Sequence, residues 1–113
     1  VNSSNGGLLH TAGIGKAIND IADIQEECNI ISSQTELKVG DVVASSAGKL
    51  TTCKKILHAI GPQWYSQCDM EYCENVLRNV MRKSFCEATE LGFCSIAIPL
   101  ISAGTFNSIE NNE

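Results

Sequence analysis

Residues 1–18 read VNSSNGGLLHTAGIGKAI, and this stretch predicts how the fold begins. One apolar residue is followed by small polar residues and four glycines, after which apolar residues return at helical spacing from Ile14. The pattern predicts the end of a strand, a glycine-rich loop and the start of a helix. Glycines let the main chain approach a ligand, and the free N–H groups of a first helical turn can bind a phosphate. A simple strand-to-helix connection that binds nothing has the same pattern.

The rest of the chain alternates between helical and strand patterns. Apolar spacing and turn residues predict a helix, two strands, a second helix and a final strand, at about 14–31, 39–44, 56–60, 72–91 and 94–98. The run ILHAI at 56–60 is typical of a central strand buried on both faces, and Gly61-Pro62 ends it. Helices that alternate with buried strands predict an α/β fold with three layers.

The second predicted helix has the clearest periodicity. A 3.6-residue repeat predicts its buried face, made of Leu77, Val80, Met81, Ser84, Phe85, Ala88 and Leu91. Gly92 is well placed to end the helix. We expect this stripe to belong to the core rather than to a binding groove. The polar residues at 32–38 are expected to form a loop after the first helix.

Composition and charge argue against several classes of function. The 113 residues are expected to form one domain at most. Eight basic and thirteen acidic residues give a net charge of −5, which argues against general binding to nucleic acid. No apolar run approaches the roughly eighteen residues of a membrane helix. The sequence shows no signal peptide, so we expect the six cysteines to be reduced and the protein to be cytoplasmic or nuclear. The cysteines also lack the spacing of a zinc site, so we expect no metal.

Four segments, in order along the chain, resemble the macrodomain family, whose members bind ADP-ribose. VNSSN, with LLH and a small-residue triplet, is similar to the family's first phosphate loop, usually VNAAN followed by GGGV. Three later segments are also similar: GDVV with AGKL at 40–50, LHAIGPQW at 57–64, and IPLISAGTF, which resembles the second phosphate loop, at 98–106. The resemblance implies a three-layer α/β/α sheet sandwich. AGKL and the helix containing IQEEC also resemble macrodomains of poly(ADP-ribose) polymerase family proteins.

The resemblance also implies segments that these residues do not include. The family has a strand pair before the first loop, with an aspartate that reads the adenine amino group, and a helix and strand after the second loop. We therefore expect a sandwich truncated at both ends, with a partial macrodomain at 1–106 and a polar acidic tail at 107–113.

By resemblance, the ligand site is built from both loops, which follow the carboxyl ends of strands. The first loop would contact the diphosphate through main-chain amides and the distal ribose through Asn5. The second would supply further phosphate contacts and Phe106, an aromatic ring that packs against the sugar. The implied ligand-binding residues are Asn5, Ala12, Gly13, Ile14, Ser102, Ala103, Gly104, Thr105 and Phe106. Asn2 is expected to fix the first loop through side-chain to main-chain hydrogen bonds.

Two histidines and one lysine have structural interpretations beside functional ones. His10 stands where some family members have a histidine, and it is interpreted either as a partly exposed loop imidazole or, together with Asn5, as a catalytic residue of a hydrolase. His58 lies in an apolar strand and is expected to be a hydrogen-bonded core residue. Lys16 could reach a phosphate, but on a helix face opposite the core it is more simply a solvated charge.

Departures from the family pattern favour binding over catalysis. Thr11-Ala12-Gly13 replaces a glycine triplet, Asn107 replaces a glycine, and Gly15 stands where one hydrolase branch has a catalytic aspartate. The leading interpretation is a module that recognises ADP-ribose, free or attached to protein, without a cofactor. A weak mono-ADP-ribosyl-protein hydrolase and a truncated fragment without ligand binding are the alternatives.

Overall fold

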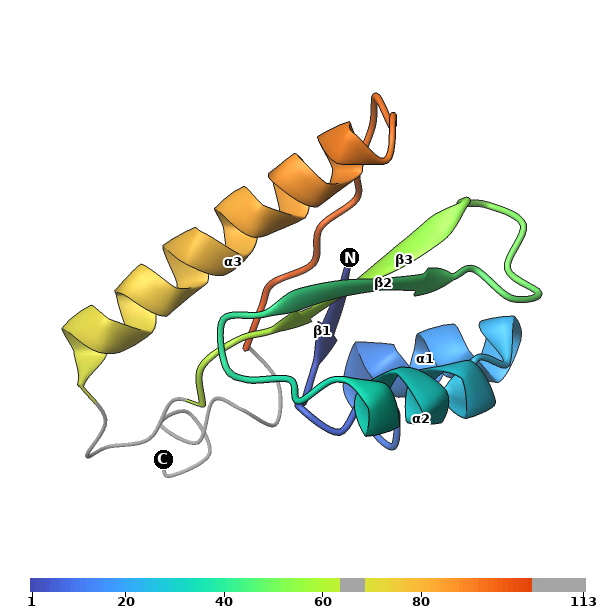
Figure 1. Cartoon of the computed structure of the whole chain (residues 1–113), viewed down its shortest axis with the longest axis horizontal. Coiled ribbons are helices and arrows are strands. Elements are labelled where there is room, and N and C mark those ends of the chain that lie inside the picture. Colours follow the sequence, from blue (N-terminus) through green and yellow to red (C-terminus); the bar gives the residue numbers. More distant parts are fainter. Residues whose placement is uncertain (64–68, 103–113) are drawn as a thin grey trace.

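The computed structural model describes residues 1–63 and 69–102. Along this part of the chain the order is β1 (Asn2–Ser4), α1 (Gly13–Ala22), α2 (Gln25–Gln34), β2 (Val42–Ser46), β3 (Lys55–Ile60) and α3 (Met70–Glu90). The strands form one sheet in the order β1-β3-β2, with β1 parallel and β2 antiparallel to β3. Helix α3 covers one face of this sheet, and α1 and α2 cover the other (Figure 1). The predicted three-layer α/β/α arrangement is confirmed.

The central position predicted for the strand at 56–60 is also confirmed, and its side chains fill both cores. Ile56 packs with Leu8 and Cys28 on the side of α1 and α2, whereas Ala59 packs with Val76 and Val80 of α3. Side chains three residues apart on a strand point to opposite faces. This explains why the apolar run is continuous rather than alternating.

The expectation of a single helix at 14–31 is wrong, because the chain turns between α1 and α2. Asp23 has a left-handed conformation with φ 56°, and its N–H donates to the carbonyl of Asn19. The Asn19 side-chain oxygen accepts from the N–H of Ile24 (2.9 Å), and the Lys49 N–H donates to the carbonyl of Ala22 (2.8 Å). Helix α2 then continues to Gln34, so the first residues of the expected 32–38 loop are helical.

The first expected strand also begins later than predicted, at Val42 rather than residue 39. Gly40 has a φ of 98° and donates its N–H to the Ile60 carbonyl (2.7 Å), while the Ile60 N–H donates to the carbonyl of Asp41 (2.9 Å). Residues 39–41 therefore form a turn that is fixed against the end of β3. The ladder of β2 starts only after this turn.

The second predicted helix is confirmed as α3, but its buried face is rotated. The Asp69 side chain caps its N-terminus by accepting from the Tyr72 N–H, and Gly92, with a φ of 82°, follows its end. Phe85 is 51% exposed. The buried side chains are small ones that let the helix lie close to the sheet, namely Cys73, Val76, Val80, Ser84 and Ala88. None of the three described helices is long and apolar enough to span a membrane.

The buried strand expected at 94–98 is not present. This segment lies beside β1 and is linked to it by a hydrogen bond from the Val1 ammonium to the Ala97 carbonyl (2.7 Å), but the described residues show no strand ladder there. Cys94 and Ala97 are exposed. A strand needs a ladder of main-chain partners along its edge, and the neighbouring β1 has only three residues.

Candidate functional site

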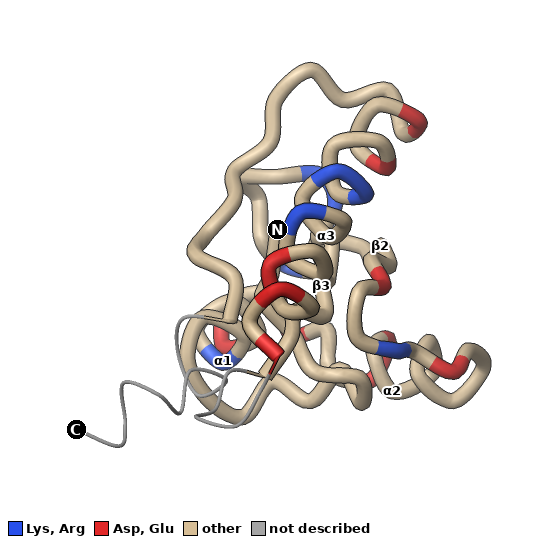
Figure 2. The backbone as a smooth tube through the Cα atoms, turned by 90° about the vertical axis from the view of Figure 1, so that its left-hand side faces the viewer, with Lys and Arg blue, Asp and Glu red and all other residues tan. Residues whose placement is uncertain are grey.

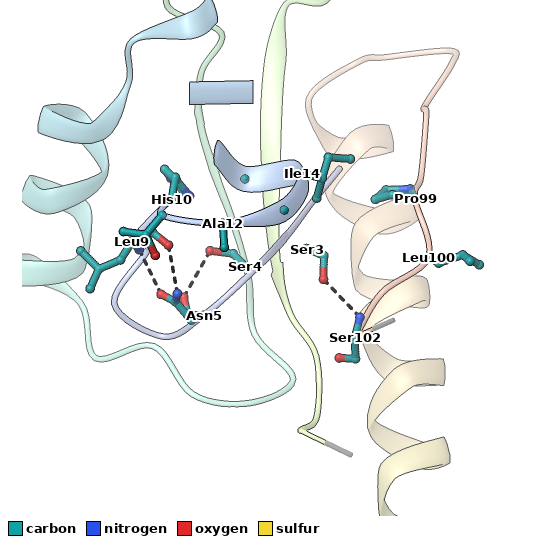
Figure 3. A pocket seen from close by; sticks show the side chains of 13 residues that line it. Ser3, Ser4, Asn5, Leu9, His10, Ala12, Ile14, Pro99, Leu100 and Ser102 are labelled. Carbon is teal, nitrogen blue, oxygen red and sulfur yellow. Dashed lines mark hydrogen bonds between the residues drawn. The ribbon is translucent and has the colours of Figure 1, made fainter. Parts of the chain in front are cut away.

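Two segments far apart in the sequence line one cavity of about 360 Å³ (Figure 3). One is the predicted first loop with the start of α1, and the other is the beginning of the predicted second loop, up to Ser102. The lining residues are Ser3, Ser4, Asn5, Leu9, His10, Thr11, Ala12, Gly13, Ile14, Gly15, Pro99, Leu100 and Ser102. Five of the predicted ligand-binding residues are therefore brought together: Asn5, Ala12, Gly13, Ile14 and Ser102. Ala103, Gly104, Thr105 and Phe106 lie outside the described residues.

The start of α1 supplies hydrogen-bond donors to this cavity. Gly13 is the first residue of the helix and has a φ of 61°, which explains a glycine there. The N-cap Ala12 makes no side-chain hydrogen bond, and the first turn has no acidic residue. The first N–H groups of a helix have no partner within the helix, so those of Gly13 and Ile14 are available to an anion.

Ser102 closes the cavity from the second segment. It is 3% exposed, and its N–H donates to the Ser3 Oγ (3.2 Å). Its own Oγ is buried and has no hydrogen-bond partner among the described residues. Gly61 lies under this segment, because a Cβ at Gly61 would overlap the Ser102 Oγ and lie 2.6 Å from the Ile101 Cγ2. The glycine before Pro62 thus allows the second segment to cross the end of β3.

Asn5 shapes the first loop with its side chain. The Asn5 amide donates to the Leu9 carbonyl and accepts from the Leu9 N–H, both at 3.0 Å (Figure 3). The Asn5 carbonyl also accepts from the N–H of Leu8, which has a φ of 52°. The implied contact between Asn5 and a ribose stays a prediction, and the structure adds a role in closing the loop.

His10 is buried, so its interpretation as a partly exposed loop imidazole is wrong. The residue is 6% exposed, and its Nε2 lies 3.3 Å from the Cys28 Sγ. Gln25 of α2 fixes the main chain here, because its side chain accepts from the His10 N–H (3.0 Å) and donates to the Leu8 carbonyl (2.9 Å). Burial lowers the pKa of His10. The sequence interpretation missed Gln25 and Cys28, which face this loop three residues apart on one helix.

His58 is the fully buried partner of His10. Their rings stack with centroids 5.2 Å apart. The His58 Nε2 lies 2.8 Å from the Ser45 Oγ, which confirms the expectation of a hydrogen-bonded core residue. Burial, with smaller contributions from His10 and the N-terminal ammonium, lowers the pKa of His58 to about 4. Burial likewise raises the pKa of Cys28 to about 11, so both groups are neutral near pH 7.

Asn2 connects the two imidazoles, and its expected bonds to the main chain are replaced by bonds to side chains. Its Nδ2 lies 3.0 Å from the His58 Nδ1 and 3.5 Å from the His10 Nδ1. Asn2 and His58 are direct partners in the β1–β3 ladder, which places their side chains together. The Asn2 Oδ1 is buried and has no partner among the described residues.

The described lining of the cavity carries no Asp, Glu, Lys or Arg, and its one titratable side chain is His10. Lys16 instead forms an exposed ion pair with Asp20 (2.8 Å), which confirms its interpretation as a solvated charge. Gly15 lines the cavity, and a Cβ there would lie 3.3 Å from the His10 Nδ1. On the other face of the sheet, α3 carries its basic residues between acidic ones (Figure 2). An anion in the cavity would therefore be held by main-chain N–H groups and hydroxyl side chains rather than by Lys or Arg.

The expectation of reduced cysteines agrees with the described residues. Cys28, Cys53, Cys86 and Cys94 are free thiols, and Cys28 and Cys73 are buried. Cys68 lies outside the described residues. Cys28 is therefore the buried thiol that contacts the loop at the cavity.

Comparison with known proteins supports the same architecture. The human protein mono-ADP-ribosyltransferase PARP14 is 37% identical over 109 residues, which are 94% of this chain and 6% of that protein. An uncharacterised protein of Pyrobaculum aerophilum is 38% identical over 109 residues, and the chain spans 57% of its length. A mutant of the Oceanobacillus iheyensis macrodomain, solved with ADPR, superposes with a TM-score of 0.83 at 28% identity, covering 93% of this chain and 58% of that one.

The match to a family model extends over nearly the whole chain. The model of the Macro domain matches residues 1–109, a range that includes both segments at the cavity. The chain is therefore a member of the Macro domain family.

Proposed function

We propose that this chain binds ADP-ribose, free or attached to a protein, in the cavity between the start of α1 and Ser102. One observation carries the proposal: the uncapped start of α1 and the segment of Ser102 line the same cavity, whose described lining has no Asp, Glu, Lys or Arg. The free N–H groups of the first helical turn suit a diphosphate. The related macrodomain solved with ADPR supports this ligand.

Turnover is expected to be weak. The described lining has no carboxylate that could activate a water, and His10 points its Nε2 toward Cys28 in the core. General acid–base catalysis by a positioned group typically contributes about 10²–10⁴ in rate. A mono-ADP-ribosylated protein should therefore be bound much faster than it is hydrolysed. We place the module in the cytoplasm or nucleus, where ADP-ribosylated proteins would be its partners.

Removing a single main-chain donor tests the proposal. Ile14→Pro deletes one N–H in the first turn of α1, where proline is compatible with a helix. Glu26→Pro makes the same change in the first turn of α2, where Glu26 is exposed and does not line the cavity. A hydrogen bond to a charged group contributes about 1.5–3 kcal/mol, so Ile14→Pro should weaken ADP-ribose binding by about 10- to 100-fold in calorimetry.

The control and the comparison of ligands decide the outcome. Glu26→Pro should bind ADP-ribose like the parent chain. ADP should bind detectably and adenosine should not, because only ADP carries the diphosphate. Equal binding of ADP-ribose by both proline variants, or equal binding of ADP and adenosine, would contradict recognition by the α1 amides.

A further inference from the structure

Three buried side chains beneath the cavity form a cluster that ADP-ribose binding does not use. His10 comes from the loop before α1, Cys28 from α2 and His58 from β3. Each offers a nitrogen or sulfur atom, and these atoms all lie within 4.8 Å of one another. The chain thus brings two imidazoles and a thiol together from three separate elements, inside the core.

The spacing of these atoms matches a metal site. The Cys28 Sγ lies 3.3 Å from the His10 Nε2 and 3.7 Å from the His58 Nε2. A tetrahedral zinc ion with Zn–S of about 2.3 Å and Zn–N of about 2.0–2.1 Å separates its sulfur and nitrogen ligands by roughly 3.5 Å. The two distances lie on either side of that value. The Ser45 Oγ, 2.8 Å from the His58 Nε2, offers an oxygen for a fourth position.

We propose that His10, Cys28 and His58 bind one thiophilic d¹⁰ cation, Zn²⁺ or Cu⁺, through His10 Nε2, Cys28 Sγ and His58 Nε2. Both ions accept imidazole and thiolate ligands. Cu⁺ would leave the site neutral, and Zn²⁺ would leave one positive charge near the carboxylate of Glu27. His10 also lines the ADP-ribose cavity, but its Nε2 faces Cys28 in the core, so the metal site does not depend on the proposed ligand of that cavity.

Asn2 provides an independent observation in favour of this site. Its Oδ1 is buried without a partner, while its Nδ2 lies 3.0 Å from the His58 Nδ1. A histidine that binds a metal through Nε2 carries its proton on Nδ1 and usually donates it to an oxygen. Turning the Asn2 amide by half a rotation would place Oδ1 where Nδ2 is, so that it accepts from His58. Asn2 thus holds, within one rotation of its amide, the acceptor that a metal-bound His58 needs, and the rotation places Nδ2 where Oδ1 now lies.

The chemistry of loading is a ligand exchange without electron transfer. The Cys28 S–H bond breaks, a sulfur–metal bond forms, and one proton leaves to solvent for each ion bound. His58 moves its proton from Nε2, where it faces Ser45, to Nδ1, where it faces Asn2. His10 needs only a lone pair on the Nε2 that already faces Cys28.

Metal retention by the whole chain and by matched cysteine variants tests the proposal. The chain is stripped with a chelator, mixed with excess Zn²⁺, or with Cu⁺ under anaerobic reducing conditions, and desalted before metal analysis. Cys28→Ser removes the proposed sulfur ligand, and Cys73→Ser removes the other described buried thiol, which lies in α3. The parent chain and Cys73→Ser should retain one equivalent, and Cys28→Ser should retain less than about a tenth of that.

A spectroscopic measurement covers the case in which Cys28→Ser does not fold. X-ray absorption of the loaded parent chain should show one sulfur and two imidazole nitrogens around the ion. Comparing retention after loading with Zn²⁺ and after loading with Cu⁺ identifies the cation. Loss of both ions on desalting, equal retention by Cys28→Ser, or a shell with more than one sulfur or without imidazole would overturn the assignment.

Discussion

Lowering the pH from about 7.5 to about 5 should destabilise the metal-free fold through His58. Burial holds the folded-state pKa of His58 at about 4, whereas an unfolded histidine titrates near 6.5. Between these values the unfolded chain binds the proton more tightly, so the free energy of unfolding falls as the pH falls. For this pair of pKa values the loss by pH 5 is about 2 kcal/mol, and His10, whose pKa is lowered too, adds to it.

Urea unfolding at several pH values in the presence of a chelator measures this effect. His58→Gln keeps a neutral polar side chain and should remove most of the slope between pH 7 and 5, while His10→Gln should keep most of it. Glu27 contributes in a separate window, because its lowered pKa costs stability only as the pH falls below about 4.5. Between pH 7 and 5, the change in the free energy of unfolding therefore reports on the histidines and not on Glu27.

A direct titration of the parent chain measures the pKa of His58 even where a variant fails to fold. In NMR spectra of the folded chain, the ring protons of His58 should not shift between pH 7 and 5. A folded-state titration of His58 near 6.5, or stability that stays constant over this range, would refute the reasoning from burial.

Three further predictions concern glycines and salt. Gly61→Ala should displace Ser102 and weaken ADP-ribose binding at least about 10-fold in calorimetry, because its Cβ would overlap the Ser102 Oγ; unchanged affinity would contradict the placement of this segment. Gly48→Ala should lower the free energy of unfolding by more than about 1 kcal/mol in urea titrations, since Gly48 has a φ of 55° and its Cβ would overlap the Ala22 carbonyl. Affinity for ADP-ribose should change by less than about 3-fold between 50 and 200 mM salt, because the described lining has no charged side chain; a steep loss would point to cationic side chains.

Elements with a long, uniform pattern could be predicted from the sequence. β3 has a continuous apolar run, and α3 has both a 3.6-residue repeat and a terminal glycine. The break between α1 and α2 could not be predicted in this way, because the apolar spacing continues through it. It depends on the Asn19 side chain and on a main-chain contact from Lys49, which is distant in sequence. The rotation of α3 likewise depends on how closely small side chains fit the sheet.

The outline of the site could also be predicted, because it depends on a local sequence pattern. The glycines and small residues of the first loop are local requirements of the main chain, and they can be recognised from the sequence alone. The inward position of His10 could not be, because Gln25 and Cys28 of α2 hold it there. The cluster with His58 was missed because its three residues come from three elements, without the short spacing by which metal ligands are usually recognised.

Gly15 links the cavity to this buried cluster. It lines the cavity, and a Cβ there would lie 3.3 Å from the His10 Nδ1 and 3.5 Å from the Asn2 Oδ1. A carboxylate on that position would favour a protonated His10, whereas burial lowers the pKa of this imidazole. A glycine at 15 and a neutral histidine at 10 are therefore consistent with each other. Together they leave the described wall without a charged group for acid–base chemistry, so this wall offers a ligand neutral groups, chiefly the main-chain N–H groups at the start of α1.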